Sequence, residues 1–143
     1  MKYLLDTSIY VGALRSDETR TQFRKTYFPL LPATFLSTVV AYELYVNARD
    51  RHTRDLVLEL VGPMERAARV ISPTFADWLK ASEIVAMIEE KSRSWRSKLP
   101  MLLNDILIAL SARRIGATLL THNRDDFLLI HRHYDFSLRV LAP

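Results

Sequence analysis

The stretch Tyr3-Leu4-Leu5-Asp6-Thr7-Ser8 decides the fold. Its three apolar residues predict a short buried strand, which ends directly at an acid followed by two hydroxyl residues. The apolar run that begins at Ile9 then predicts a helix over 9–14. In an open parallel sheet, ligands bind at the edge formed by the carboxyl ends of the strands. An aspartate at the end of the first strand therefore marks a candidate functional site.

The rest of the chain repeats this alternation of short apolar runs and longer helical stretches. Further strands are predicted at 34–37, 69–71, 117–121 and 138–141, and helices at 17–27, 38–51, 53–61, 74–91 and 102–114. Gly62-Pro63 is expected to stop one helix and Gly116 another. Thr74, with Asp77 three residues later, predicts an N-cap. The pattern predicts the α/β class, with an open parallel β-sheet flanked by α-helices.

Length and composition indicate a single globular domain and exclude several kinds of site. The length of 143 residues predicts one domain, 1–143, and 49% hydrophobic and 25% charged residues are typical of a globular chain. The absence of cysteine excludes disulfides, thiolate nucleophiles and Cys-ligated zinc. No apolar run approaches the roughly 20 residues of a membrane-spanning helix, and the N-terminus lacks a secretory pattern. We therefore expect a cytoplasmic protein that does not enter a membrane.

The charge balance points toward a nucleic-acid partner. Lys and Arg total 20 against 16 Asp and Glu, and fifteen of the cations are Arg. Arg contacts phosphate in a bidentate manner and stacks on bases, which favours RNA or DNA as a ligand. A solvated basic surface is the alternative that net charge alone leaves open.

Three carboxylates stand alone in apolar sequence. Asp6 follows the first strand, Glu43 is the only charge in 39–46, and Asp105 is the only charge in 101–110. A buried acid must be paired, bound to a metal or used in function. Taken singly, Asp6 and Asp105 could favour helix starts and Glu43 could face solvent. The shared pattern favours a common site.

Grouped carboxylates repel one another unless a cation compensates their charge. Because no histidine or cysteine lies close to these acids in the sequence, the matching ion is a hard one, Mg²⁺ or Mn²⁺. Such ions commonly serve phosphoryl chemistry, where they polarise phosphate and activate water.

Four segments of the chain resemble, in order, the motifs of PIN-domain ribonucleases: Leu4-Leu5-Asp6-Thr7-Ser8, Ala41-Tyr42-Glu43-Leu44, the run from Asn104 to Ala112, and the run from Ala117 to Phe127. The resemblance covers almost the whole chain, and size and organisation look most like the VapC toxins of bacterial and archaeal toxin–antitoxin pairs. It implies a PIN-like domain with Mg²⁺- or Mn²⁺-dependent endoribonuclease activity and a cognate VapB-like antitoxin. We also expect a homodimer.

The resemblance implies a role for each motif residue. Asp6 and Asp105 are the expected principal metal ligands, and Glu43 binds the metal through water or orients the attacking water. Hydroxyls that position these carboxylates are expected at Thr7, Ser8 and Thr121, whose alternative role is local capping.

The fourth motif departs from one common pattern of the family. Many members carry an aspartate two residues after the Thr, where this chain has Asn123. Others keep an Asn there and carry the acid just before the Phe, which is Asp126 in this chain. Asp126 is therefore the first choice for the fourth catalytic acid, with Asn123 and Asp125 behind it. Read locally, Asp125 and Asp126 are turn formers.

Candidate RNA-binding side chains precede the Asp105 helix, at Arg93, Trp95, Arg96 and Lys98. Cations hold phosphates and an aromatic ring can stack on an unpaired base. The alternative is a solvated helix end, with Trp95 in the core or in a dimer contact. A second basic group, Arg49, Arg51 and Arg54, is interpreted as a solvated surface or a contact for an acidic partner. The run His131-Arg132-His133 is interpreted as a polar loop, with metal binding as the alternative.

Two other functions remain open at this level. One is an RNA-processing PIN nuclease that has no antitoxin, and the other is a catalytically weak RNA-binding PIN domain, which the Asn at 123 would suit. A phosphoryl-accepting domain is disfavoured, because no Lys lies near the strand-end motifs.

Overall fold

A computed structural model describes residues 1–143 except for the side chains of residues 93, 95 and 96. Its centre is a five-stranded parallel sheet in the order β3-β2-β1-β4-β5. The strands are β1 (Lys2–Leu5), β2 (Thr34–Ser37), β3 (Val70–Ile71), β4 (Ala117–Thr121) and β5 (Leu138–Val140). The predicted α/β class and open parallel sheet are confirmed.

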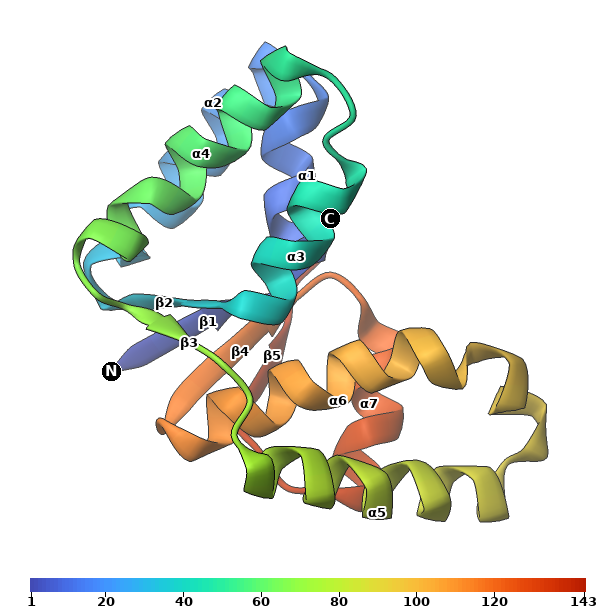
Figure 1. The fold of residues 1–143 in the computed structure, drawn as a ribbon. Helices are drawn as coiled ribbons and strands as arrows, with labels where there is room; N and C mark the ends of the chain where they lie inside the picture. Colours follow the sequence, from blue (N-terminus) through green and yellow to red (C-terminus); the bar gives the residue numbers. More distant parts are fainter.

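The helices form two layers, one on each face of the sheet (Figure 1). One layer holds α1 (Thr7–Arg15), α2 (Asp17–Tyr27), α3 (Thr38–Asn47) and α4 (Arg51–Arg66); the other holds α5 (Phe75–Lys91), α6 (Leu99–Arg114) and α7 (Arg124–His133). Short 3₁₀ segments, η1 (Phe28–Ala33) and η2 (Arg93–Lys98), precede β2 and α6. Parallel crossovers are right-handed, so the helices change face when the strand order turns back from β3 to β4.

The core explains why the inner strands read as continuous apolar runs. Leu4, Leu5, Leu119 and Leu120 are at most 1% exposed, because helices cover both faces of β1 and β4. Helix α6 is buried at every position from 105 to 112, which is the pattern of a helix inside the core. Asp105 lies within this buried stretch.

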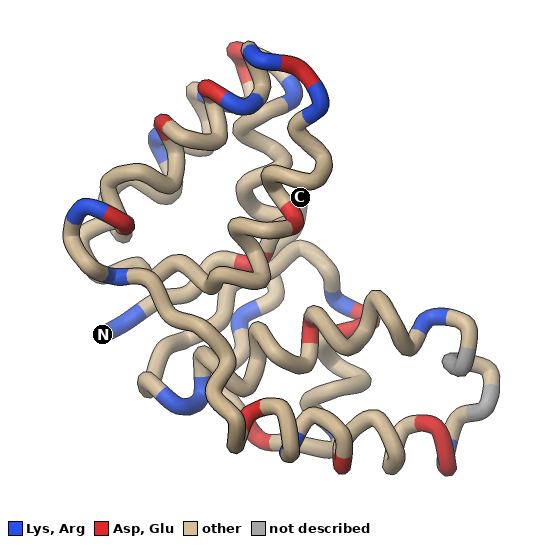
Figure 2. The backbone as a smooth tube through the Cα atoms, viewed as in Figure 1, with Lys and Arg blue, Asp and Glu red and all other residues tan. Residues whose placement is uncertain are grey.

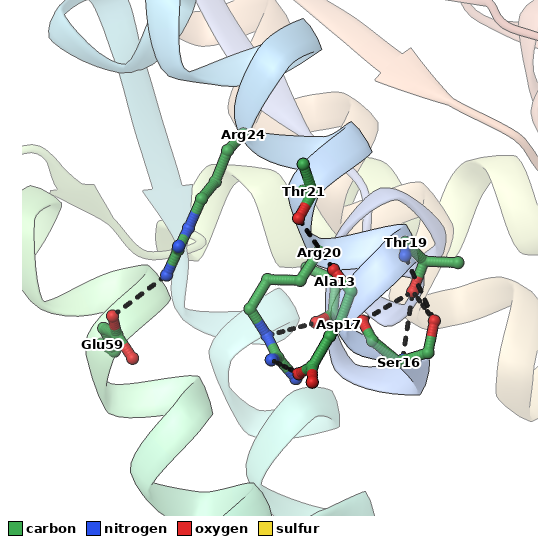
Figure 3. A network of polar contacts seen from close by, with 8 residues as sticks. All are labelled: Ala13, Ser16, Asp17, Thr19, Arg20, Thr21, Arg24 and Glu59. Carbon is green, nitrogen blue, oxygen red and sulfur yellow. Dashed lines mark hydrogen bonds and ion pairs between the residues drawn. The ribbon is translucent and has the colours of Figure 1, made fainter.

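Polar contacts join α2 to α1 and to α4 (Figure 3). Arg20 donates from Nε to the Ala13 carbonyl at 3.0 Å and from a guanidinium nitrogen to Asp17 at 2.7 Å. Arg24 reaches Glu59 on α4 at 3.3 Å. These two arginines therefore link helices of the same layer.

One predicted helix end is wrong. The helix predicted for 53–61 does not stop at Gly62-Pro63, because α4 continues through Pro63 to Arg66. Proline inside a helix costs about 3 kcal/mol. The extra turn buries Met64 completely, and its Sδ accepts a hydrogen bond from the Tyr10 hydroxyl at 3.6 Å. Burial of a Met side chain contributes roughly 1.5–3 kcal/mol, which offsets half or more of the proline cost.

The structure predicted for the segment after β4 is also wrong. Asp125 and Asp126 do not form a turn, and residues 131–133 are not a loop, because all of them belong to α7. Phe127 and Ile130 are fully buried three residues apart, and this packing holds the helix. Acids in its first turn and basic residues in its last suit the helix dipole.

Other boundaries shift by a few residues. The helix predicted for 38–51 ends at Asn47. Helix α6 begins at Leu99, and Pro100 lies in its first turn. Backbone N–H groups of a first turn have no partner within the helix, so a proline that lacks this N–H costs no hydrogen bond there. The Thr74 cap is confirmed by its reciprocal bonds with Asp77, and Gly116 follows α6 with a φ of +69°. Among the described helices, none is both long and apolar enough to cross a membrane.

Candidate active site

The strand order reverses between β1 and β4, and the candidate carboxylates meet at the carboxyl ends of these two strands. An open pocket of about 180 Å³ lies there. Crevices at such a switch point are the usual ligand sites of parallel α/β sheets. The pocket is lined by Asp6, Thr7, Ser8, Glu43, Met101, Asn104, Asp105, Asn123 and Asp126. Helices α3 and α6, from opposite layers, bring Glu43 and Asp105 to the residues that follow β1 and β4.

Asp6 is held by the first turn of α1 and by β4. Its backbone N–H donates to the Leu120 carbonyl at 2.9 Å, which extends the pairing of β1 with β4 by one bond. Its side chain is the N-cap of α1 and accepts from the Ser8 amide at 3.4 Å and the Ser8 hydroxyl at 2.7 Å. The Thr121 hydroxyl donates to the same oxygen, Oδ2, at 2.8 Å. Asp6 is only 3% exposed, and the same residue caps α1 and lines the pocket.

The hydroxyls of Ser8 and Thr121 tie the two strand ends together. Their oxygens lie 3.3 Å apart. Ser8 Oγ accepts from the His122 amide at 3.1 Å, and Thr121 Oγ1 accepts from the Asn123 amide at 2.8 Å. The same two hydroxyl groups therefore orient both the Asp6 carboxylate and the segment that leads into α7.

Glu43 is half-buried on α3. The Thr7 hydroxyl donates to its Oε1 at 2.6 Å. Burial raises the pKa of Glu43, and so does the Asp6 charge, whereas hydrogen bonds from Thr7 and Asn104 lower it. Sequence reasoning assigned no role to Asn104 or Met101; the position of Asn104 directly before the isolated Asp105 is the signal that could have found it.

Asp105 is the most perturbed acid of the site. Its pKa is raised to about 9, mainly by burial and further by the charges of Asp6, Asp126 and Glu43 and by a hydrogen bond to Asp126. Four carboxyl groups therefore interact in one pocket, and without a cation the pocket retains a proton at neutral pH.

The structure separates the three candidates for the fourth acid. Asp126 and Asn123 both line the pocket, and Asn123 Nδ2 donates to Asp126 Oδ2 at 3.0 Å. Asp125 is exposed and lines a neighbouring groove instead. Of the candidate RNA-binding residues, Arg93, Trp95 and Arg96 have side chains outside the described part of the chain, and Lys98 lines the same groove as Asp125.

The donor set suits a hard divalent cation. The described side chains that line the pocket offer carboxylate, amide and hydroxyl oxygens and no Lys or Arg. Among the described residues, no group of three or more acidic or histidine side chains is already arranged closely enough to hold a metal ion. A divalent cation bound among these carboxylates would offset their mutual repulsion, which adds to burial in raising the Asp105 pKa.

We expect Asp105→Asn to stabilise the metal-free protein in a pH-dependent manner. Because the folded pKa exceeds the unfolded value, the native state binds more protons between about pH 4 and pH 9, and stability falls as pH rises. The substitution removes this loss, so the gain should be small near pH 4 and should grow toward pH 8, by up to about 1.4 kcal/mol for each pH unit. Urea unfolding in a chelator at both pH values measures it. An equal change at both would contradict the expectation.

Comparison with known proteins gives one family and several solved structures of the same fold. The PIN domain family matches residues 3–132. VapBC-1 from nontypeable Haemophilus influenzae is 21% identical over 98% of each chain, with a TM-score of 0.66. VapBC2 from Rickettsia felis, bound to a promoter DNA fragment, is 20% identical over 99% of each chain, with a TM-score of 0.62. DNA-bound VapBC from Salmonella typhimurium is 20% identical over 98% of each, with a TM-score of 0.63. No curated protein matches the chain in sequence.

Proposed function

Because the chain belongs to the PIN domain family, we propose that it is a metal-dependent endoribonuclease and the toxin of a type II toxin–antitoxin pair. The observation that carries the proposal is the convergence of Asp6, Glu43, Asp105 and Asp126 in one pocket, with the Asp105 pKa raised to about 9. Perturbed acids gathered at a switch-point crevice are typical of a catalytic site rather than a structural one. A cleavage assay with single-stranded RNA, with and without Mg²⁺, tests it.

In this proposal, Asp6 and Asp105 hold the ion. When bound, Mg²⁺ or Mn²⁺ polarises the scissile phosphate, activates water and stabilises the leaving oxygen. Thr121 and Ser8 bind Asp6 through one oxygen, Oδ2, so they fix the carboxylate's orientation.

Glu43 orients the attacking water and accepts its proton. Burial raises the pKa of Glu43, which makes it a better proton acceptor than a fully solvated carboxylate. The bonds from Thr7 and Asn104 hold its side chain at the pocket wall.

Asp126 supplies the fourth carboxylate, held by the Asn123 amide. We expect Asp126→Ala to weaken Mn²⁺ binding by about 10- to 100-fold, the usual cost of losing a group that supports a metal site. Asp125→Ala should leave binding unchanged, because Asp125 faces the neighbouring groove. Calorimetric titration of both variants measures this, and the reverse order of effects would assign the fourth acid to Asp125. Asn123→Asp should tighten binding if position 123 itself contacts the ion.

A VapB-like antitoxin is the proposed protein partner. The three solved proteins above are described as VapBC assemblies, two of them bound to DNA, and their fold extends over nearly the whole of this chain. A toxin that cleaves cellular RNA acts in the cytoplasm, where we place this protein.

We also propose a homodimer that contacts through α5. Phe75, Trp78 and Leu79 are 79%, 50% and 53% exposed and lie on one face of this helix, at i, i+3 and i+4. Large exposed apolar groups mark interfaces, and a two-fold axis lets one stripe cover its own copy.

Leu79→Glu is expected to convert the dimer to a monomer, because it places a charge in the apolar contact. Light scattering at several concentrations measures the mass. Leu58→Glu on α4 is a matched control, since Leu58 is 52% exposed and lies in the other helix layer. A Leu79→Glu protein that remains dimeric would exclude this face.

A further inference from the structure

A second, larger groove adjoins the candidate active site along α7. Its volume is about 510 Å³, and it is lined by Lys98, Asn123, Asp125, Asp126, Leu128, Leu129 and Arg132. Asn123 and Asp126 line both this groove and the pocket of the carboxylates. The two hollows are therefore neighbours, and a ligand that occupies both would pass over these two side chains.

The lining residues of α7 change in charge from one end of the groove to the other. Asp125, Leu128 and Arg132 follow one another at helical spacing on a single face. The acids stand at the pocket end, and Arg132 stands six residues beyond Asp126, about 9 Å along the helix axis. Lys98 comes from the junction of η2 and α6 and adds a second cation to the lining.

Arg132 differs from the arginines that hold the fold together. Arg20, Arg24, Arg69, Arg113 and Arg114 each donate to a carboxylate or a backbone carbonyl. Arg132 is exposed and makes no hydrogen bond or ion pair with the described residues. Its guanidinium is available for a ligand, and basic positions are otherwise spread over both helix layers (Figure 2).

We propose that this groove binds the RNA strand on one side of the scissile phosphate, with Arg132 on a backbone phosphate. The inference rests on the proposed nuclease function and extends its substrate site. Near the pocket the acids serve the metal ion, whereas farther along the strand the phosphate charge must be met directly by cations. The partly exposed side chain of Leu128, which lies between the acids and Arg132 on this face, contacts the sugar or base. Such phosphate contacts position a strand without reading its sequence.

Binding of a fluorescent twelve-nucleotide single-stranded RNA, measured by anisotropy in a chelator at several salt concentrations, tests the groove. We expect Arg132→Gln to weaken binding about five- to tenfold and to reduce the slope of log Kd against log salt by about 0.7, the value for one lost contact to a single strand. Arg132→Lys should retain most of the slope, because it keeps the charge. Arg51→Gln, an exposed arginine in the other helix layer, is the matched control and should change neither quantity.

Two results would overturn the proposal. One is wild-type binding by Arg132→Gln, which would leave Arg132 for another partner such as an acidic protein segment. The other is an equal loss in Arg51→Gln, which would reduce the effect to overall charge. A parallel Mg²⁺ cleavage assay separates this proposal from the nuclease assignment. A wild-type protein that binds RNA through Arg132 but never cleaves it refutes only the nuclease, whereas cleavage insensitive to Arg132→Gln, with unchanged binding, refutes only the groove.

Discussion

Asp105→Asn should lose at least about a thousandfold of RNA-cleaving activity while the protein remains folded, because each tenfold corresponds to about 1.4 kcal/mol and a metal ligand contributes several such steps. Asn keeps the shape of Asp and its hydrogen-bonding capacity but removes the charge that binds the cation. A chelator should abolish cleavage by the wild type, and Mg²⁺ or Mn²⁺ should restore it. Single-turnover cleavage of a labelled RNA measures both effects.

The matched control for this prediction is Asp55→Asn, which removes the same charge from an exposed position on α4. It should cleave like the wild type. A folded Asp105→Asn protein with full activity would remove Asp105 from the site, and cleavage that persists in a chelator would refute the metal-dependent reaction itself.

Substitutions at Asp6 should separate its role in stability from its role in cleavage. Asp6→Asn keeps an oxygen that can accept from Ser8 and Thr121, so its stability should change little, whereas Asp6→Ala leaves these groups unpaired and should cost about 1–3 kcal/mol. Both variants should lose at least about a thousandfold in cleavage, because both remove the ligand charge. Thermal unfolding and the cleavage assay together measure the two roles.

An active Asp6→Asn protein would show that the carboxylate only caps α1. Equal stability of the Ala variant and the wild type would show instead that the hydrogen bonds to Oδ2 contribute nothing to folding.

Much of the fold follows from local patterns in the chain. Strands β2 and β4 occupy the predicted residues, and the other three lie within one residue of their predicted positions, because strands buried on both faces must be apolar throughout. The predicted stop at Gly62-Pro63 failed because the rule for proline counts a local cost, and the compensating burial of Met64 depends on Tyr10, far away in sequence. Helix α7 was not predicted because it begins with Asn, Arg and Asp residues, which are also common in turns, ahead of its buried apolar positions.

The sequence by itself determined which acids are candidates, since an isolated charge in an apolar run requires compensation wherever it folds. Tertiary structure alone decided how they act on one another. The raised Asp105 pKa depends on Asp6, Glu43 and Asp126, which come from three separate segments. Adjacent residues of a helix point about 100° apart, so Asp126 lines the pocket and Asp125 does not, a choice that composition and spacing leave open. The groove at Arg132 exists only because α7 is a helix, which keeps one face continuous from the pocket to its last turn.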